Sequence, residues 1–270
     1  MTQGKGKTVA FQKQAKQLIG AAALSLLLSP MVTAAELPRG TTFFDDFDHL
    51  DRGIWGVSDG WVNGDWQNCE WARDAVAFND GVLSLTFAAA DAVSRDYTCG
   101  EIQSRHTYGH GAYEARIKTA HGSGLNAAFF TYIGPHHGRP HDEIDFEVLT
   151  RDTSHVSLNT YVSGKPVNGS SVALPAPSDD GFQTYSFIWA EDGIKWYVDG
   201  VLVHETAPGT PLPTNPQKIY ASFWGSETYD DWMGPFVDPD TPIAMEIDWI
   251  AFTEQGDGCQ FPGSVLCALE

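Results

Sequence analysis

Residues 143–147 read Glu-Ile-Asp-Phe-Glu, a pattern that alternates acidic with large apolar side chains. Successive side chains of a β-strand point to opposite faces, so the pattern predicts a strand with one packed face and one acidic face. The acidic face would carry Glu143, Asp145 and Glu147. Three like charges in a row repel one another and add nothing to a core, so we expect them to serve chemistry.

The first 35 residues have the features of an export signal. Four lysines, at positions 5, 7, 13 and 16, precede the apolar run Leu18–Val32, and the small residues Thr33–Ala35 offer a cleavage site. The alternative is a membrane anchor, but an apolar run of about 15 residues is shorter than the roughly 20 that span a bilayer. We therefore expect a cleaved signal peptide at 1–35 and a secreted or periplasmic domain at 36–270.

The charge balance of the chain excludes some partners. The sequence holds 16 basic and 35 acidic residues, and loss of residues 1–35 removes four lysines and no acids, which leaves a formal charge of −23. Such a chain is a poor partner for nucleic acid or an anionic membrane surface. The charge also argues mildly against a heavily sulfated or uronic polysaccharide. The remaining 235 residues suit one domain with a substantial core, and we expect a monomer.

Four cysteines in an exported chain favour disulfides over zinc, and no Cys-x-x-Cys pair or Cys/His cluster is present in the sequence. Three pairings are open. Proximity in sequence favours Cys69 with Cys99 and Cys259 with Cys267. The alternative is two or more buried free thiols.

Between Thr41 and Thr253 the chain alternates short β-rich segments with turn residues, and no long helical period is present. The clearest segments are Val82–Phe87, Gly111–Lys118, Ala127–Ile133, His155–Val162, Thr184–Trp189, Ile194–Val198, Val201–Glu205 and Ala244–Phe252. Asp199-Gly200 predicts a tight hairpin between two of them. This spacing predicts an all-β fold, an antiparallel β-sandwich of the jelly-roll kind.

Paired carboxylates are the groups that cleave glycosidic bonds. One carboxylic acid protonates the leaving oxygen, and a second carboxylate attacks the anomeric carbon or activates water. On a flat strand the Cα atoms of Glu143 and Glu147 lie about 13 Å apart, whereas a retaining enzyme holds its carboxyl groups roughly 5 to 5.5 Å apart. A curved strand with inward-leaning side chains would close that gap. A Glu beside two ionised carboxylates also has a raised pKa, which suits a general acid.

The segment His141–Leu149 resembles the catalytic strand of glycoside hydrolase family 16, in the lichenase-like (endo-β-1,3-1,4-glucanase) subgroup. The similarity runs from Phe43 to Phe252 and includes, in the family's order, Asp59–Gly64, Cys99–Glu101, Gly109–Glu114, Phe129–Tyr132, Ile194–Gly200 and Asp230–Trp232. The resemblance implies a jelly roll with a concave carbohydrate cleft and a retaining mechanism that needs no catalytic cofactor. It implies Glu143 as nucleophile, Glu147 as general acid/base and Asp145 as assisting carboxylate.

The resemblance also implies a set of sugar-binding residues, namely Trp61, Asn63, Glu101, Asn159, Tyr161, Trp224 and Trp232. We expect His141 to bind substrate as well, because its position lies near these sugar contacts. Aromatic faces stack on pyranose rings, while amides and carboxylates select hydroxyls. His141 stands where typical lichenases have Trp, and Gln103 stands where Arg is frequent, so linkage specificity is open. We expect endo-cleavage of β-1,3-1,4-glucan. The alternatives are a succinoglycan-type exopolysaccharide depolymerase, a xyloglucan hydrolase or transglycosylase, and a jelly-roll protein that binds carbohydrate without cleaving it.

Family 16 members often carry a structural calcium away from the cleft. The matched ligands are the Asp248 side chain and the backbone carbonyls of Asp46 and Gly81, which are oxygen donors suited to a hard cation. The alternative is that Asp248 only continues an alternating strand. The histidines at 136, 137 and 141 lack a shared register, so we expect them in a polar loop at the cleft rim rather than in a metal site.

Overall fold

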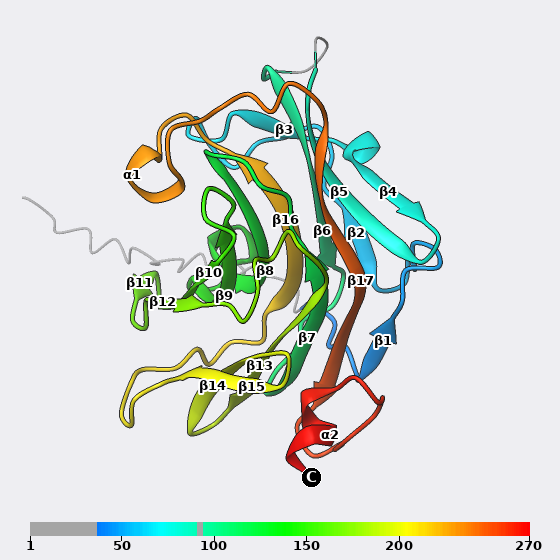
Figure 1. Cartoon of the computed structure of the whole chain (residues 1–270). Coiled ribbons are helices and arrows are strands. Elements are labelled where there is room, and N and C mark those ends of the chain that lie inside the picture. The colour runs from blue at the N-terminus through cyan, green and yellow to red at the C-terminus, as the bar shows by residue number, and fades with distance from the viewer. Residues whose placement is uncertain (1–36, 91–93) are drawn as a thin grey trace, which may run out of the picture. The chain divides into compact units, whose positions relative to one another are not determined.

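The computed structural model describes residues 37–90 and 94–270, which belong to one compact unit. Regular structure in this part of the chain is almost entirely β, in two stacked sheets (Figure 1). None of the helices in the described ranges is long and apolar enough to cross a membrane. The predicted signal peptide at 1–35 lies outside the described residues.

The first sheet, here the inner sheet, carries the acidic strand. Its strands, in order across the sheet, are β2 (Trp55–Val57), β6 (Tyr97–Ser104), β16 (Lys218–Gly225), β8 (Leu125–Ile133), β9 (Asp142–Leu149) and β10 (His155–Val162). Strand β10 also pairs with β11 (Lys165–Pro166) and β12 (Ser170–Ala173). All of these pairs are antiparallel. The short β3 (Cys69–Trp71) adds to β6 in parallel.

The second sheet, here the outer sheet, is also antiparallel. Its strands, in order across the sheet, are β4 (Val76–Asn79), β5 (Val82–Ala89), β17 (Ile243–Glu254), β7 (Gly111–Lys118), β13 (Gln183–Ala190), β14 (Gly193–Val198) and β15 (Val201–Glu205). The short β1 (Phe43–Asp45) pairs with residues 250–252 of β17, after the part of β17 that pairs with β5. The 3₁₀ helices η1 (Arg73–Ala75) and η2 (Pro135–His137) and the short helices α1 (Asp230–Met233) and α2 (Val265–Leu269) complete the fold.

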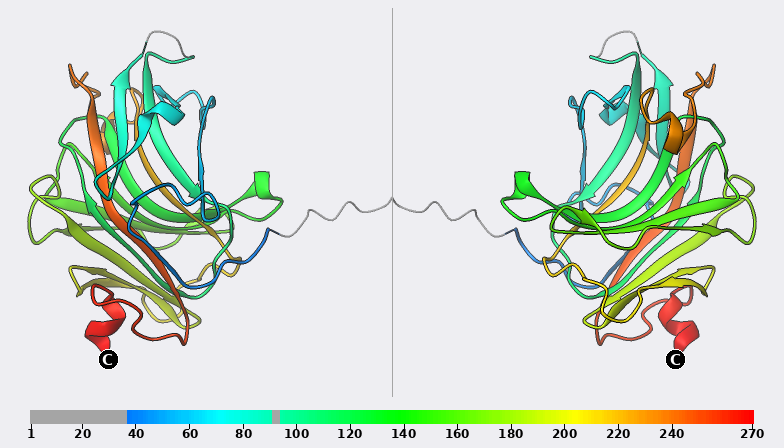
Figure 2. Two further views of the ribbon diagram at one scale, coloured as in Figure 1. Left: turned by 90° about the vertical axis from the view of Figure 1, so that its right-hand side faces the viewer. Right: turned by 90° about the vertical axis from the view of Figure 1, so that its left-hand side faces the viewer.

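The core lies between the two sheets. Phe146 of the acidic strand is 5.4 Å from Tyr185 and 6.3 Å from Phe187 between ring centroids, so the apolar face of β9 packs directly on β13. Ile144 beside it is fully buried. This packing fixes the register of β9, because a slip by one residue would move its carboxylates into the core. In the two side views of Figure 2 the long strands curve markedly.

The fold agrees with the expectation of an antiparallel jelly-roll sandwich. Each of the eight predicted segments is a strand whose ends lie within two residues of the predicted ones. The hairpin at Asp199-Gly200 joins β14 to β15 with φ values of 48° and 75°, as a two-residue turn with two left-handed positions requires. Trp189, Trp196 and Trp249 are buried in or against the core, as their positions in predicted strands indicate.

Both predicted disulfides are present, Cys69–Cys99 and Cys259–Cys267. The first joins β3 to β6, and the second closes the C-terminal tail. That tail is fastened to the outer sheet by the buried carboxylate of Glu114, which accepts hydrogen bonds from Ser264 Oγ (2.6 Å) and from the backbone N–H of Val265 (2.7 Å). The tail is therefore an integral part of the same unit.

Candidate active site

The acidic strand β9 lies in the inner sheet between β8 and β10. Its alternation is the predicted one, since Ile144, Phe146 and Val148 are buried in the core while Glu143, Asp145 and Glu147 face a cavity of about 770 Å³. The cavity is lined by side chains from β6, β8, η2, β9 and β16 and from the loop before β3, which are Trp61, Val62, Asn63, Trp66, Glu101, Gln103, Ala128, Phe130, Tyr132, His136, His137, Glu143, Asp145, Glu147, Tyr220, Ser222 and Trp224.

Strand register explains the shape of this cavity. The row of residues opposite Glu147 consists of small and acidic side chains, because Ala128 pairs with Glu147, Ser222 pairs with Ala128, and Glu101 pairs with Ser222. The next row, opposite Asp145, is large and aromatic, with Phe130 and Tyr220. The small side chains at 128 and 222 therefore leave open space across the sheet between two acidic groups, Glu147 and Glu101.

Glu147 has the electrostatic character of a general acid. Burial raises its pKa to about 7, and the charge of Glu143 adds to the rise. Asn126 on β8 opposes the rise, because its Nδ2 atom donates a hydrogen bond of 2.8 Å to Glu147 Oε1. A carboxyl group with a pKa near 7 remains protonated at mildly acidic pH and can give up its proton readily.

Asp145 lies between the two glutamates and is buried. Burial raises the pKa of Asp145 well above its ordinary value, and the neighbouring charges of Glu143 and Glu147 add to this effect. Its Oδ1 atom has no hydrogen-bond partner among the described residues. The raised pKa favours the protonated form of Asp145, and a protonated Asp145 lowers the repulsion that three ionised carboxylates would create.

Glu143 is in contact with His141, the residue just before β9. His141 Nε2 is hydrogen-bonded to Glu143 Oε2, and the imidazole stacks on Tyr161 with 4.8 Å between ring centroids. Of the sequence-predicted sugar-binding residues, His141 and Tyr161 are thus grouped beside Glu143. Neither of them is among the residues that line the cavity.

Glu101 closes the opposite side of the cavity floor. Burial raises its pKa to about 7, against the effects of a 2.5 Å hydrogen bond from Ser58 Oγ and of the charge of Lys218. Lys218 donates to Gln103 Oε1 and is itself partly desolvated, which lowers its pKa to about 8. Ser58 thus holds an acceptor oxygen of Glu101 in place, and Lys218 holds that of Gln103.

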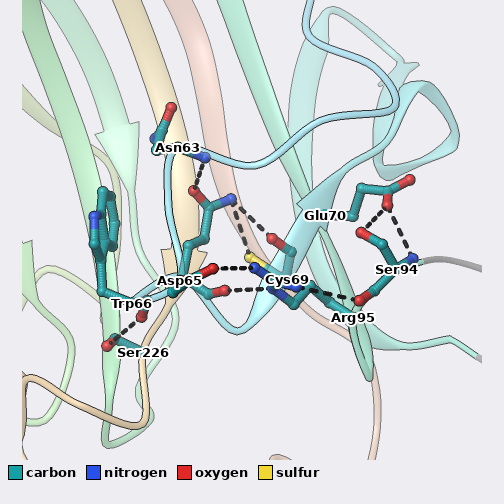
Figure 3. A network of polar contacts seen from close by, with 9 residues as sticks. Asn63, Asp65, Trp66, Cys69, Glu70, Ser94, Arg95 and Ser226 are labelled. Atoms are coloured by element: carbon teal, nitrogen blue, oxygen red, sulfur yellow. Dashed lines mark hydrogen bonds and ion pairs between the residues drawn. The ribbon is translucent and has the colours of Figure 1, made fainter.

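Aromatic side chains form the other end of the cavity. Trp61 is 41% exposed, and Trp66 packs edge-on against Trp224 with 4.9 Å between ring centroids. The loop that carries Asn63 and Trp66 is fastened to the disulfide region (Figure 3). Its buried anchor is Gln67, whose Oε1 accepts from the Asn63 backbone N–H (3.1 Å) while its Nε2 donates to the Cys69 carbonyl (2.9 Å).

The three carboxylates of β9 lie at the floor of a cavity that is partly aromatic, and the residues that form it are shared with a known family. The profile of Glycosyl hydrolases family 16 matches residues 63–251. The chain belongs to glycosyl hydrolase family 16. The match covers the cavity-lining loop from Asn63 onward, all three carboxylates and most of β17.

The relatives of this family 16 chain include glucan-cleaving enzymes. It is 51% identical over 229 residues, or 85% of each chain, to the endo-1,3-1,4-beta-glycanase ExoK of Rhizobium meliloti (strain 1021). It is 35% identical to the beta-glucanase of Bacillus subtilis (strain 168) over 232 residues, which cover 86% of this chain and 94% of the relative. The solved Bacillus licheniformis beta-glucanase superposes with a TM-score of 0.75 at 35% identity, covering 80% of this chain and 99% of that one. The chain is therefore a glycoside hydrolase with the β-glucanase fold.

The predicted sugar-binding residues divide into two groups. Trp61, Asn63, Glu101 and Trp224 line the cavity. Trp232 on α1 lies outside the lining set, 6.3 Å from Trp224 between ring centroids. Asn159 is opposite Asp145 on β10, and its Oδ1 accepts from the N–H of Thr160. Of the three histidines expected at the cavity rim, His136 and His137 line the cavity and His141 does not.

Several functional side chains were not predicted from the sequence. They include Asn126, Gln67 and Trp66, which lie outside the motifs Asp59–Gly64 and Phe129–Tyr132. The only available signal was strand parity: Asn126 shares the alternation of Ala128 and Phe130 and so faces the same side as Glu147. Gln67 and Trp66 lie in irregular backbone, where parity gives no guidance.

The expected calcium ligands fit a cation only in part. A side chain added at Gly81 would lie 3.7 Å from the Asp46 carbonyl oxygen, so these two positions are adjacent. The Asp248 carboxylate, however, is paired with the Arg116 guanidinium, which already supplies a positive charge. Within residues 37–90 and 94–270, no group of three or more His, Cys, Asp or Glu side chains is arranged to hold a metal ion.

Proposed function

We propose that this family 16 enzyme is an endo-acting, retaining β-glucanase that cleaves β-1,3-1,4-glucan. The observation that carries the proposal is the row of three carboxylates on the floor of an aromatic cavity, one of which has a pKa near 7. The relative from Rhizobium meliloti, an endo-1,3-1,4-beta-glycanase, supports this linkage, and the beta-glucanase of Bacillus subtilis supports a β-glucan substrate.

In the proposed mechanism Glu143 attacks the anomeric carbon while Glu147 gives its proton to the leaving glycosidic oxygen, so that a covalent glycosyl–Glu143 ester forms as the bond to the leaving sugar breaks. Water then attacks the same carbon, the ester bond breaks, and Glu147 takes a proton from that water. Asp145 between them would reduce repulsion in both steps. Glu143, Asp145 and Glu147 line the same cavity from one face of β9, which supports their joint action on one glycosidic bond.

The cavity favours a neutral glucan. Trp61, Trp66 and Trp224 offer apolar ring surface, and the formal charge of −23 that remains after loss of residues 1–35 disfavours a polyanion. The discriminating experiment is a product profile on barley β-1,3-1,4-glucan, laminarin, xyloglucan and a succinoglycan-type polymer. We expect rapid mid-chain cleavage of the first. Activity on none of the β-glucans would refute the proposal, and binding without cleavage would favour a carbohydrate-binding protein.

The balance between hydrolysis and transglycosylation depends on whether water or a sugar reaches the covalent intermediate first. We propose hydrolysis as the main outcome. New reducing ends should then rise in step with the fall of polymer length, whereas transglycosylation would redistribute chain lengths without that rise.

A structural calcium is a further part of the proposal, supported by the closeness of Asp46 and Gly81. Calcium should raise the melting temperature of the wild type and leave that of Asp248→Asn unchanged. An equal response in both proteins would place any bound calcium elsewhere.

We also propose export with cleavage after residue 35, and a monomeric state in solution. The basic and apolar pattern of residues 1–35 supports the first. N-terminal sequencing of the protein recovered from outside the cytoplasm tests the cleavage site, and light scattering tests the monomer.

A further inference from the structure

We propose that His141 is a positioning residue for Glu143, and that it acts through its Nε2 atom rather than as a stacking surface for a sugar ring. The inference rests on the proposed role of Glu143 as nucleophile. It departs from the sequence-based expectation that His141 binds the substrate directly.

The contact between the two side chains is direct. His141 Nε2 meets Glu143 Oε2, and the two side chains are only 29% and 20% exposed. A carboxylate only accepts hydrogen bonds, so Nε2 carries the proton and donates it to Oε2. One oxygen of Glu143 is thereby held by His141.

Aromatic neighbours leave the imidazole little ring surface for a sugar. Tyr161 stacks on it at an interplanar angle of 15°, which covers one face, and the ring of Tyr132 lies 5.1 Å away at 65°. His141 is also not among the residues that line the cavity. His141 therefore acts on the reaction through Nε2, the ring nitrogen that contacts Glu143.

The backbone around His141 is held firmly. The His141 carbonyl accepts from the Gly164 N–H at 2.8 Å. The next residue, Asp142, is buried, and its carboxylate accepts from the backbone N–H groups of Ser163 (2.9 Å), Thr214 (3.2 Å) and Asn215 (3.2 Å). A donor fixed by backbone anchors and by two aromatic neighbours needs no rearrangement when the substrate binds.

This arrangement bears on both chemical steps. In the first step a Glu143 oxygen forms a bond to the anomeric carbon, and the hydrogen bond to the other oxygen keeps the carboxylate aimed along the line of attack. In the second step the ester bond breaks and Glu143 regains its negative charge, which the same N–H stabilises. His141 neither gains nor loses a proton in either step.

Two substitutions separate the nitrogen from the ring. His141→Phe keeps the aromatic surface and removes the donor, whereas His141→Gln removes the ring and places an amide N–H near the position of Nε2. We expect His141→Phe to lower kcat about 10- to 100-fold with KM changed less than threefold, and His141→Gln to retain most of kcat. His204→Phe, on strand β15 of the outer sheet, is the matched control and should keep wild-type kcat.

The result that overturns the inference is a His141→Phe variant that is as active as His141→Gln or more so, because a stacking surface prefers Phe. A second measurement guards against general damage to the fold. In a Glu143→Ala background rescued by azide on an aryl glycoside, His141→Phe should cause no further loss, since its partner is gone. A loss as large as in the wild-type background would show that His141 acts elsewhere.

Rates are measured on the polymer of the panel that the wild type cleaves fastest. Failure on β-1,3-1,4-glucan with activity on another polymer would thus refute the proposed substrate and leave the test of His141 intact.

Discussion

Asn126 Nδ2 donates a hydrogen bond of 2.8 Å to Glu147 Oε1, from the strand next to β9. Both residues belong to the cavity side of the inner sheet, and Asn126 is fully buried. The bond favours the ionised form of Glu147 and so lowers its pKa, while burial acts in the opposite direction and prevails. Asn126 thus tunes the proton affinity of the proposed general acid.

The variant Asn126→Ala should move the alkaline limb of kcat/KM to higher pH. Glu147 has to be protonated to act as an acid, so wild-type activity should fall as pH rises through about 7. Loss of a single hydrogen bond, worth about 1 kcal/mol, raises the pKa of Glu147 by roughly 0.7 units. A pH profile of kcat/KM measures the shift.

The control for this prediction is Asn168→Ala, because Asn168 pairs with His204 away from the cavity. Its pH profile should match the wild type. A limb that stays in place in Asn126→Ala, or moves to lower pH, would show that Asn126 does not act on the general acid.

The acidic strand and the fold around it could be predicted because they depend on local alternation. The carboxylates at 143, 145 and 147 and the apolar residues between them specify which face packs, and the observed register preserves that choice. The paired cysteines followed from compartment and proximity. These features depend on neighbouring residues, so a single sequence contains them.

The remainder of the site depends on contacts between distant segments. Lys218 meets Gln103 because β16 pairs with β6, and Gln67 reaches Asn63 and Cys69 through irregular backbone. The strands β6 and β16 were themselves not among the clearest predicted segments. β16 is buried on both faces and lacks alternation, and β6 contains Gly100, where a Cβ atom would lie 2.7 Å from the Ala75 carbonyl oxygen.

Glu101 should make the protein less stable as pH rises. Its folded-state pKa of about 7 lies above its ordinary value of 4.5, so the folded state binds the proton more tightly than the unfolded chain does. The contribution to stability is complete below pH 4.5 and is lost as pH rises through 7. Glu101→Gln should remove this loss, which amounts to at most about 3 kcal/mol between pH 4.5 and 8.

Urea unfolding at pH 5 and pH 8 provides the measurement for Glu101. The free energy of unfolding of the wild type should fall more than that of Glu101→Gln between the two pH values, because Glu147 contributes equally to both proteins. Glu205→Gln on the exposed end of β15 is the control and should behave as the wild type. Equal pH dependence of Glu101→Gln and wild type would contradict the assignment.

The Cys69–Cys99 disulfide should affect both stability and substrate binding. It closes a separation of 30 residues, which corresponds to about 3.5 kcal/mol in the chain-entropy relation. Its removal by Cys69→Ala with Cys99→Ala also loosens the contact that holds Gln67, and with it Asn63. We expect a lower melting temperature together with a raised KM.

The second disulfide is the matched control for the first. Cys259→Ala with Cys267→Ala opens a separation of eight residues in a tail fastened to the outer sheet, so it should cost about 2.5 kcal/mol and leave KM unchanged. A KM that rises equally in both double variants would exclude a specific role of Cys69–Cys99 in holding the cavity loop.

The proposed division of labour between the glutamates predicts different azide products. Glu143→Ala lacks the nucleophile and should lose several orders of magnitude in rate on every substrate. Azide can then replace the carboxylate in a single displacement, which inverts the anomeric carbon and gives an α-glycosyl azide. Asp145→Asn should lie between the wild type and Glu143→Ala, because it perturbs both neighbours and removes neither.

Glu147→Ala should respond in the opposite sense. A substrate with an activated leaving group needs little protonation, so the covalent intermediate still forms, and its breakdown becomes slow because water lacks a base. Azide needs no base and attacks that intermediate from the face the leaving group vacated, which gives a β-glycosyl azide. Proton NMR of the two products distinguishes the anomers. An α-azide from Glu147→Ala and a β-azide from Glu143→Ala would exchange the roles of the two residues, because only the residue that forms the ester can be replaced with inversion.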